Sequence, residues 1–153
     1  MSSVRIVDTS VLCNLLRVPN RDQEADRAVR EFGRAQAARD VFLLPIAVIY
    51  ETGNHIAHSP NGAKRRVVAE GFVELVRKAF EGEIPFTPTP LQNSEDMTRW
   101  LDEFPDRAMT GMGFADLAIT KVWEEQCELN QGRRVLIWSY DGHLQGYDRP
   151  ARI

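Results

Sequence analysis

The sequence predicts an α/β protein: a three-layer sandwich with a central parallel sheet of about four or five strands, flanked by helices. Two observations support this fold class. Short β-branched or apolar runs alternate along the chain with longer segments whose apolar residues recur at helical spacing. The 153 residues also suit one domain, expected to span residues 1–153, that can bury a core without disulfides.

The expected strands are short and mostly apolar, as in a sheet covered on both faces. The third is the weakest, because Pro85, Pro88 and Pro90 prevent a long strand there. The four expected strands cover residues 4–7, 41–44, 84–86 and 135–138.

The expected helices lie between these strands. Thr9 and Ser10 offer N-cap chemistry for the first, Pro45 suits the first turn of the third, and Ser94 is a candidate cap for the fifth. The glycine-containing stretch 106–113 is expected to be a loop. The six expected helices cover residues 11–17, 21–39, 45 to about 58, 63–80, 93–104 and 114–129.

Composition points to an ordinary globular protein, with 43% hydrophobic and 27% charged residues. No apolar stretch is long enough to span a membrane, and the start lacks the apolar core of a signal peptide, so we expect a cytoplasmic protein. Cys13 and Cys127 stand in no metal or redox spacing and are expected to be reduced thiols. A net charge of −3 is unusual for a nucleic-acid enzyme, although four clustered carboxylates would account for it.

Four acidic residues stand where ligands bind in parallel sheets, beyond the carboxyl ends of the strands. Asp8 follows the first strand, Glu51 lies on the helix after the second, Asp116 begins the helix before the last strand, and Asp141 follows that strand. Taken singly, each has an ordinary explanation as a helix cap, a turn residue or a solvated helix residue. Only the fold could bring them together.

The segments around these acids resemble the motifs of PIN domains. Asp8 precedes a small hydroxyl residue, as in the opening strand of that family, and Tyr147 stands where many members place an aromatic residue. Ser139 occupies a position where threonine is commoner, and residues 84–112 match nothing recognisable in the family. The resemblance spans residues 4–147 and is carried by residues 6–12, 45–51, 113–119 and 138–144.

The resemblance implies a PIN-like, Rossmann-like fold and a metal-dependent endoribonuclease with RNA as its substrate. Asp8, Glu51 and Asp116 would anchor the principal ion, with Asp141 assisting. Oxygen ligands favour Mg²⁺ or Mn²⁺ over zinc, and clustered carboxylates are tolerable only with cations or raised pKa values. Beside these acids, Thr9 and Ser139 would orient carboxylates or bind the scissile phosphate.

Weaker candidates for RNA contacts are basic. His55 shares a helix face with Glu51, and His143 lies in the last motif. Lys64, Arg65 and Arg66 could grip phosphates, although a charge cluster in the first turn of a helix is more often solvated surface.

Three roles remain open at this stage. The leading one is the toxin of a type II toxin–antitoxin pair, because many stand-alone PIN domains of this length resemble VapC-type toxins; a small antitoxin protein and a homodimer are then implied. The others are a housekeeping RNA-processing nuclease and a non-catalytic scaffold that binds RNA or protein. A phosphatase of the haloacid dehalogenase type is excluded, because Ser10 stands where that chemistry needs a second aspartate.

Overall fold

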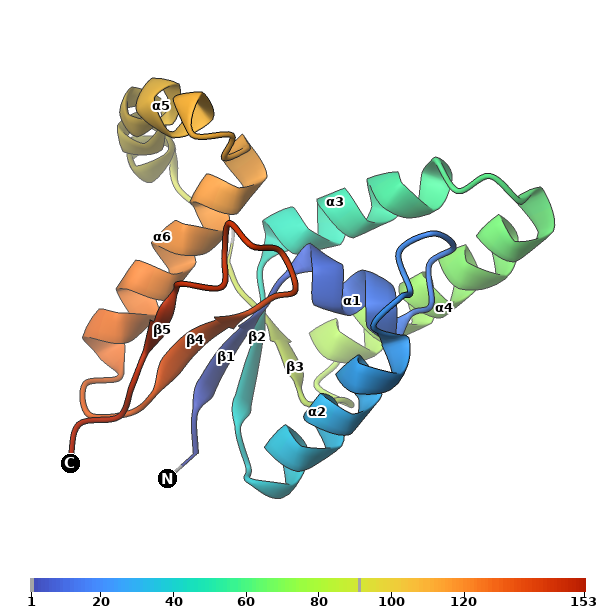
Figure 1. Cartoon of the computed structure of the whole chain (residues 1–153), viewed down its shortest axis with the longest axis horizontal. Coiled ribbons are helices and arrows are strands. Elements are labelled where there is room, and N and C mark those ends of the chain that lie inside the picture. The colour runs from blue at the N-terminus through green and yellow to red at the C-terminus, as the bar shows by residue number, and fades with distance from the viewer. Residues whose placement is uncertain (1, 91) are drawn as a thin grey trace.

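A computed structural model describes residues 2–90 and 92–153, and within them the chain forms a five-stranded sheet flanked by helices (Figure 1). The strand order is β3-β2-β1-β4-β5, with β1 to β4 parallel and β5 antiparallel to β4. The expected α/β class with a parallel central sheet is confirmed. The strands are β1 (Val4–Val7), β2 (Val41–Leu44), β3 (Phe86–Pro88), β4 (Val135–Trp138) and β5 (Asp148–Arg149).

The helices connect these strands and cover the sheet. None of those within the described residues has the length and apolar character needed to cross a bilayer. They are α1 (Thr9–Leu15), α2 (Ala25–Ala37), α3 (Ile46–Ala57), α4 (Gly62–Phe80), α5 (Ser94–Met109) and α6 (Phe114–Leu129).

Strand β1 lies at the point where the strand order reverses. The chain leaves β1 for β2 and β3 on one side and returns to β4 on the other, so the connections after β1 and β4 diverge. The two strand ends are joined directly, because the Asp8 amide donates to the Trp138 carbonyl at 3.1 Å. Such a switch point leaves a crevice beyond the carboxyl ends of the strands, where ligands bind in open α/β sheets. Both chain termini lie at the opposite end of the sheet (Figure 1).

An aromatic cluster fixes α2 against the sheet. The Phe32 ring of α2 lies 5.2 Å from Phe42 and 5.5 Å from Phe86, and Trp138 lies 6.0 Å from Phe42. Burying one such side chain contributes about 1.5–3 kcal/mol. The cluster therefore holds α2 against β2, β3 and the last residue of β4.

Several element boundaries differ from expectation for local reasons. Helix α1 begins at Thr9 because Asp8, not Thr9 or Ser10, is its N-cap and accepts from the Ser10 amide at 3.3 Å. Helix α2 begins only at Ala25, because positive φ angles at Arg17 (54°) and Asn20 (65°) turn the preceding segment into a loop.

The sheet also differs from expectation at its two edge strands. Strand β3 covers Phe86–Pro88 rather than residues 84–86, and Pro88 is tolerated because β3 is an edge strand. Strand β5 was not expected; it has only two residues.

Helix α5 runs through Pro105 to Met109, so the expected end at residue 104 and the loop from 106 were wrong. Phe104 packs edge-on against Phe114 at 5.2 Å, which holds this part of α5 on α6. The N-cap of α5 is Asn93 rather than Ser94, because its side chain accepts from the Asp96 amide at 2.8 Å.

Candidate acidic site

The four acidic residues singled out in the sequence line one hollow of about 340 Å³. Asp8 stands between β1 and α1, Glu51 in the middle of α3, Asp116 in the first turn of α6, and Asp141 in the segment after β4. Four separate elements thus bring their carboxylates to the crevice at the switch point of the sheet. The hollow is also lined by Thr9, Ser10, Cys13, Asn14, Asn20, Arg21, Gln23, Glu24, His55 and Tyr140.

The Asp8 carboxylate is buried and firmly held, with only 3% of the residue exposed. Its Oδ2 accepts from the hydroxyls of Ser10 and Ser139, both at 2.7 Å, and from the Ser10 amide at 3.3 Å. These bonds fix the orientation of the carboxylate. Because all three bonds go to one oxygen, Oδ1 accepts none from the residues that the structure describes.

Glu51 is oriented by α1, which packs against α3. The Thr9 hydroxyl donates to Glu51 Oε2 at 3.1 Å. On the other side, His55 Nε2 lies 3.7 Å from Glu51 Oε1, one helical turn away. The pKa of His55 is lowered, first by burial and then by the positive charge of Arg21, with Glu51 opposing both. Neutral His55 can accept or donate one hydrogen bond at this rim without adding charge.

Asp116 has no such support. None of the residues 2–90 and 92–153 donates a hydrogen bond to its carboxylate. Burial, and then the negative charges of Asp8, Glu51 and Asp141, raise the pKa of Asp116 to about 6, with His143 acting in the opposite direction. The four acids therefore act on one another electrostatically, as like charges do in a partly dry crevice.

The segment after β4 carries Asp141 into the site through a series of side-chain bonds. The Asp141 amide donates to the Ser139 hydroxyl at 2.9 Å, and the His143 amide donates back to Asp141 Oδ1 at 2.9 Å. Gly111 approaches this segment from the end of α5: its φ is +86°, and a Cβ there would lie 3.6 Å from His143 Cε1. His143 therefore borders the site from the side of Asp116.

The donor chemistry of the hollow fits a hard divalent cation, because every acidic ligand offers oxygen. The carboxylates, however, lie too far apart to bind one ion together in this arrangement. Within the described part of the chain, no group of three or more His, Cys, Asp or Glu residues is placed so that it could hold a metal ion. The carboxylates line the walls of one hollow without converging on one point, so a bound ion would require their side chains to move inward.

The basic cluster at the start of α4 lies outside this hollow. Arg65 is committed to the fold, because its Nε and Nη2 donate to the Ser59 carbonyl at 2.8 and 2.5 Å. Arg66 pairs with Glu70 at 3.0 Å on the exposed surface, and Lys64 lines another depression, which shares Asn20 with the acidic hollow. The structure thus brings His55 to the acids, and leaves the Lys64, Arg65 and Arg66 cluster elsewhere.

Several residues of the site were not anticipated. Ser10 was considered only as a helix cap, yet its hydroxyl contacts Asp8 at 2.7 Å and accepts from the Tyr140 amide at 3.0 Å. Asn14 is buried; its amide donates to the Ser10 carbonyl and its Oδ1 accepts from the Glu24 amide, so it fixes the loop that carries Arg21. The small hydroxyl residue two positions after Asp8 was the available signal for Ser10.

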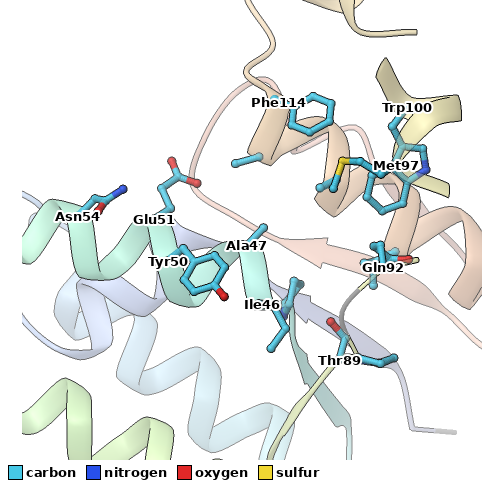
Figure 2. A pocket seen from close by; sticks show the side chains of 15 residues that line it. Ile46, Ala47, Tyr50, Glu51, Asn54, Thr89, Gln92, Met97, Trp100 and Phe114 are labelled. Atoms are coloured by element: carbon cyan, nitrogen blue, oxygen red, sulfur yellow. The ribbon is translucent and has the colours of Figure 1, made fainter. Parts of the chain in front are cut away.

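A second, apolar groove of about 390 Å³ adjoins the acidic hollow. Figure 2 shows Tyr50 and Ala47 of α3 on one side, Phe114, Met97 and Trp100 on the other, and Glu51 at the edge. Tyr50 is exposed, whereas Trp100 is buried against α6. Because Glu51 lines both depressions, the acidic hollow and the apolar groove meet at one side chain.

Comparison with known proteins gives no match to a family model, to a curated protein or to a solved structure.

Proposed function

We propose that the protein is a metal-dependent endoribonuclease of the PIN type, which hydrolyses phosphodiester bonds of RNA with Mg²⁺ or Mn²⁺. One observation carries the proposal: carboxylates from four separate elements line one hollow at the switch point of the sheet, where burial and then the negative charges of the other three raise the pKa of Asp116 to about 6. Such uncompensated repulsion in a crevice is typical of functional sites rather than of structural ion pairs.

In this proposal Asp8, Glu51 and Asp116 hold the principal ion, and Asp141 assists directly or through water. A bound divalent ion supplies an activated water and neutralises charge that develops on the phosphate. The remaining residues prepare the site: Ser139 donates to Oδ2 of Asp8 at 2.7 Å and so fixes the carboxylate, and Thr9 donates to Glu51 at 3.1 Å.

The choice of RNA over DNA rests on the likeness of four segments to PIN motifs, at residues 6–12, 45–51, 113–119 and 138–144. The same likeness leads us to propose a toxin that pairs with a small antitoxin protein and forms a homodimer. A neighbouring gene for a small antitoxin would support this role over RNA processing.

One observation favours a different candidate, a non-catalytic scaffold that binds RNA or protein. The carboxylates do not converge into a ready metal site within the described residues. A nuclease requires the four carboxylates to move together around an ion, whereas a scaffold does not.

Cleavage of a panel of structured RNAs and matched DNAs by the purified protein tests the proposal. We expect RNA cleavage that requires Mg²⁺ or Mn²⁺, stops with EDTA and is absent from Asp116→Asn. RNA binding without cleavage at any metal concentration would instead identify a scaffold, and cleavage that persists in EDTA would exclude the metal mechanism.

A further inference from the structure

Glu31 of α2 accepts three side-chain hydrogen bonds although it does not line the acidic hollow. Trp138 Nε1 and the Tyr140 hydroxyl donate to its Oε2 at 2.7 and 2.8 Å, and Arg27 Nε donates to its Oε1 at 2.7 Å. Burial alone would raise the pKa of Glu31, but these donors together hold it below its ordinary value. Glu31 is therefore an ionised carboxylate, and hydrogen bonds to a charged acceptor are the strong ones.

The two uncharged donors belong to the end of β4 and to the segment that follows it. Trp138 is the last residue of β4, and Tyr140 stands between Ser139 and Asp141. From Tyr140 the connection continues into the site, because its amide donates to Ser10 Oγ at 3.0 Å and Ser10 Oγ donates to Asp8 Oδ2 at 2.7 Å. Glu31 of α2 is thus linked to the Asp8 carboxylate through the covalent frame of Tyr140 and the Ser10 hydroxyl.

The segment from Ser139 to Tyr147 depends on such anchoring, because it contains no helix or strand. Its first two amides after Ser139, those of Tyr140 and Asp141, donate to side-chain hydroxyls rather than to a neighbouring strand. The Tyr140 side chain anchors the start of this segment from outside: Glu31 binds its hydroxyl, and the Arg27 guanidinium lies 4.7 Å from the ring centre. The far end is anchored separately, by the buried Leu144 and by Tyr147, whose carbonyl accepts from the Ile137 amide at 2.9 Å.

We propose that Glu31 is a positioning residue for the acidic site. By fixing the Tyr140 hydroxyl and the Trp138 indole, it sets the direction in which Ser139 and Asp141 leave β4, and so keeps the Ser139 hydroxyl on Asp8 and the Asp141 carboxylate in the hollow. The effect on metal binding rests on the proposed function; the effect on the segment does not.

Hydrogen exchange at the Tyr140 and Asp141 amides tests the positioning role without metal. We expect Glu31→Ala and Tyr140→Phe to speed exchange at both amides by about tenfold or more relative to Ile6 in β1 and Leu43 in β2. Glu31→Gln should restore protection, because its carbonyl oxygen still accepts from Trp138 and Tyr140. Asp26→Ala is the matched control: Asp26 is an exposed, ion-paired carboxylate of the same helix, facing Arg17.

Unchanged exchange at the two amides in both variants would overturn the proposal. An equal increase at every amide, core strands included, would also overturn it, because it would assign Glu31 to general stability. If Glu31→Ala fails to fold, Tyr140→Phe decides the matter, since it removes one hydroxyl and keeps the ring.

Calorimetric titration with Mn²⁺ gives the functional readout. Loss of a residue that orients metal ligands lowers metal affinity by about 10–100-fold, and we expect Glu31→Ala to fall in this range and Glu31→Gln to recover. Wild-type affinity in Glu31→Ala would contradict a role in metal positioning. A wild-type protein that binds no Mn²⁺ would contradict the proposed function instead, and the exchange experiment would still decide the positioning role.

Discussion

The two sides of the acidic hollow are built in opposite ways. On the side formed by the ends of β1 and β4, Asp8 is buried, caps α1 and receives two hydroxyl hydrogen bonds at 2.7 Å. On the side formed by α6, Asp116 has burial and three neighbouring negative charges, which together raise its pKa to about 6. Folding therefore gives Asp8 its hydrogen-bond partners, whereas it places Asp116 among like charges.

This difference distinguishes an acidic residue that stabilises the fold, Asp8, from one whose charge destabilises the metal-free protein, Asp116. Removing the charge of Asp8 removes supports of α1 and of the Ser139 segment, whereas removing the charge of Asp116 relieves repulsion. Stability and function should therefore move together at Asp8 and in opposite directions at Asp116.

The largest expected effect is on catalysis. Asp116→Asn and Asp8→Asn should each reduce single-turnover RNA cleavage by orders of magnitude, because both remove transition-state charge stabilisation. The double variant should be little worse than either single variant, since the residues act as a unit. Cleavage near the wild-type rate by folded Asp116→Asn would contradict the mechanism.

Substitutions at the same two positions should differ in stability when Asp8 is replaced by alanine, which cannot cap a helix. Asp116→Asn should unfold at the same or a higher temperature than the metal-free wild type, and Asp8→Ala should lose about 0.5–2 kcal/mol as a helix cap is removed. Thermal melts without metal measure both. Equal destabilisation by the two substitutions would remove the distinction between the two sides.

Bound metal should stabilise the protein by relieving the repulsion at Asp116. At about 100 times its Kd, Mn²⁺ should raise the free energy of unfolding by about 2.7 kcal/mol, and Asp116→Asn should show a smaller gain. Melts with and without Mn²⁺, together with calorimetry, provide the comparison. An unchanged wild-type midpoint at millimolar Mn²⁺ with no heat of binding would count against a metal site.

A smaller effect should follow from pH. The pKa of Asp116 rises from 3.8 to about 6 on folding, so between these values the folded state binds more protons than the unfolded state. Stability of the metal-free protein should therefore fall as pH rises from about 4 to about 6 and then level off. Chemical denaturation across this range should show the wild-type contribution, and Asp116→Asn should lack it. A contribution of the opposite sign would rule out a raised pKa.

The smallest effect is expected at the basic cluster of α4, whose residues do not line the hollow. Lys64→Ala combined with Arg66→Ala should leave RNA affinity and its salt dependence almost unchanged, because neither residue lines the acidic site. If the pair contacts phosphates, the slope of log affinity against log salt should instead fall by about 1 for each lost contact. Filter binding over a salt series distinguishes the two outcomes.

The sequence predicted the strands and helices around the site better than the hydrogen bonds within it. The observed bounds of β1, β2, β4 and α6 are the same as those that the sequence predicts, because apolar runs and helical periodicity are local signals. The meeting of the four acids also follows from topology, since carboxyl ends of parallel strands share one edge.

The interior depends on contacts between distant segments. Asp8 and Ser139 are 131 positions apart, and Trp138 and Glu31 are 107 apart, so no local pattern announces either bond. The late start of α2 and the passage of α5 through Pro105 likewise depend on a tight loop and on the packing of Phe104, which propensity does not encode.

The placement of the chain ends has a practical consequence. Both termini lie at the end of the sheet opposite the carboxyl ends of β1 and β4 (Figure 1), which carry the acidic hollow. An affinity tag, a fluorophore or a linker to a sensor surface joined at either end would extend away from the acids. The immobilised protein would then present its crevice to the solution, where a polymer as large as a folded RNA can approach it unhindered.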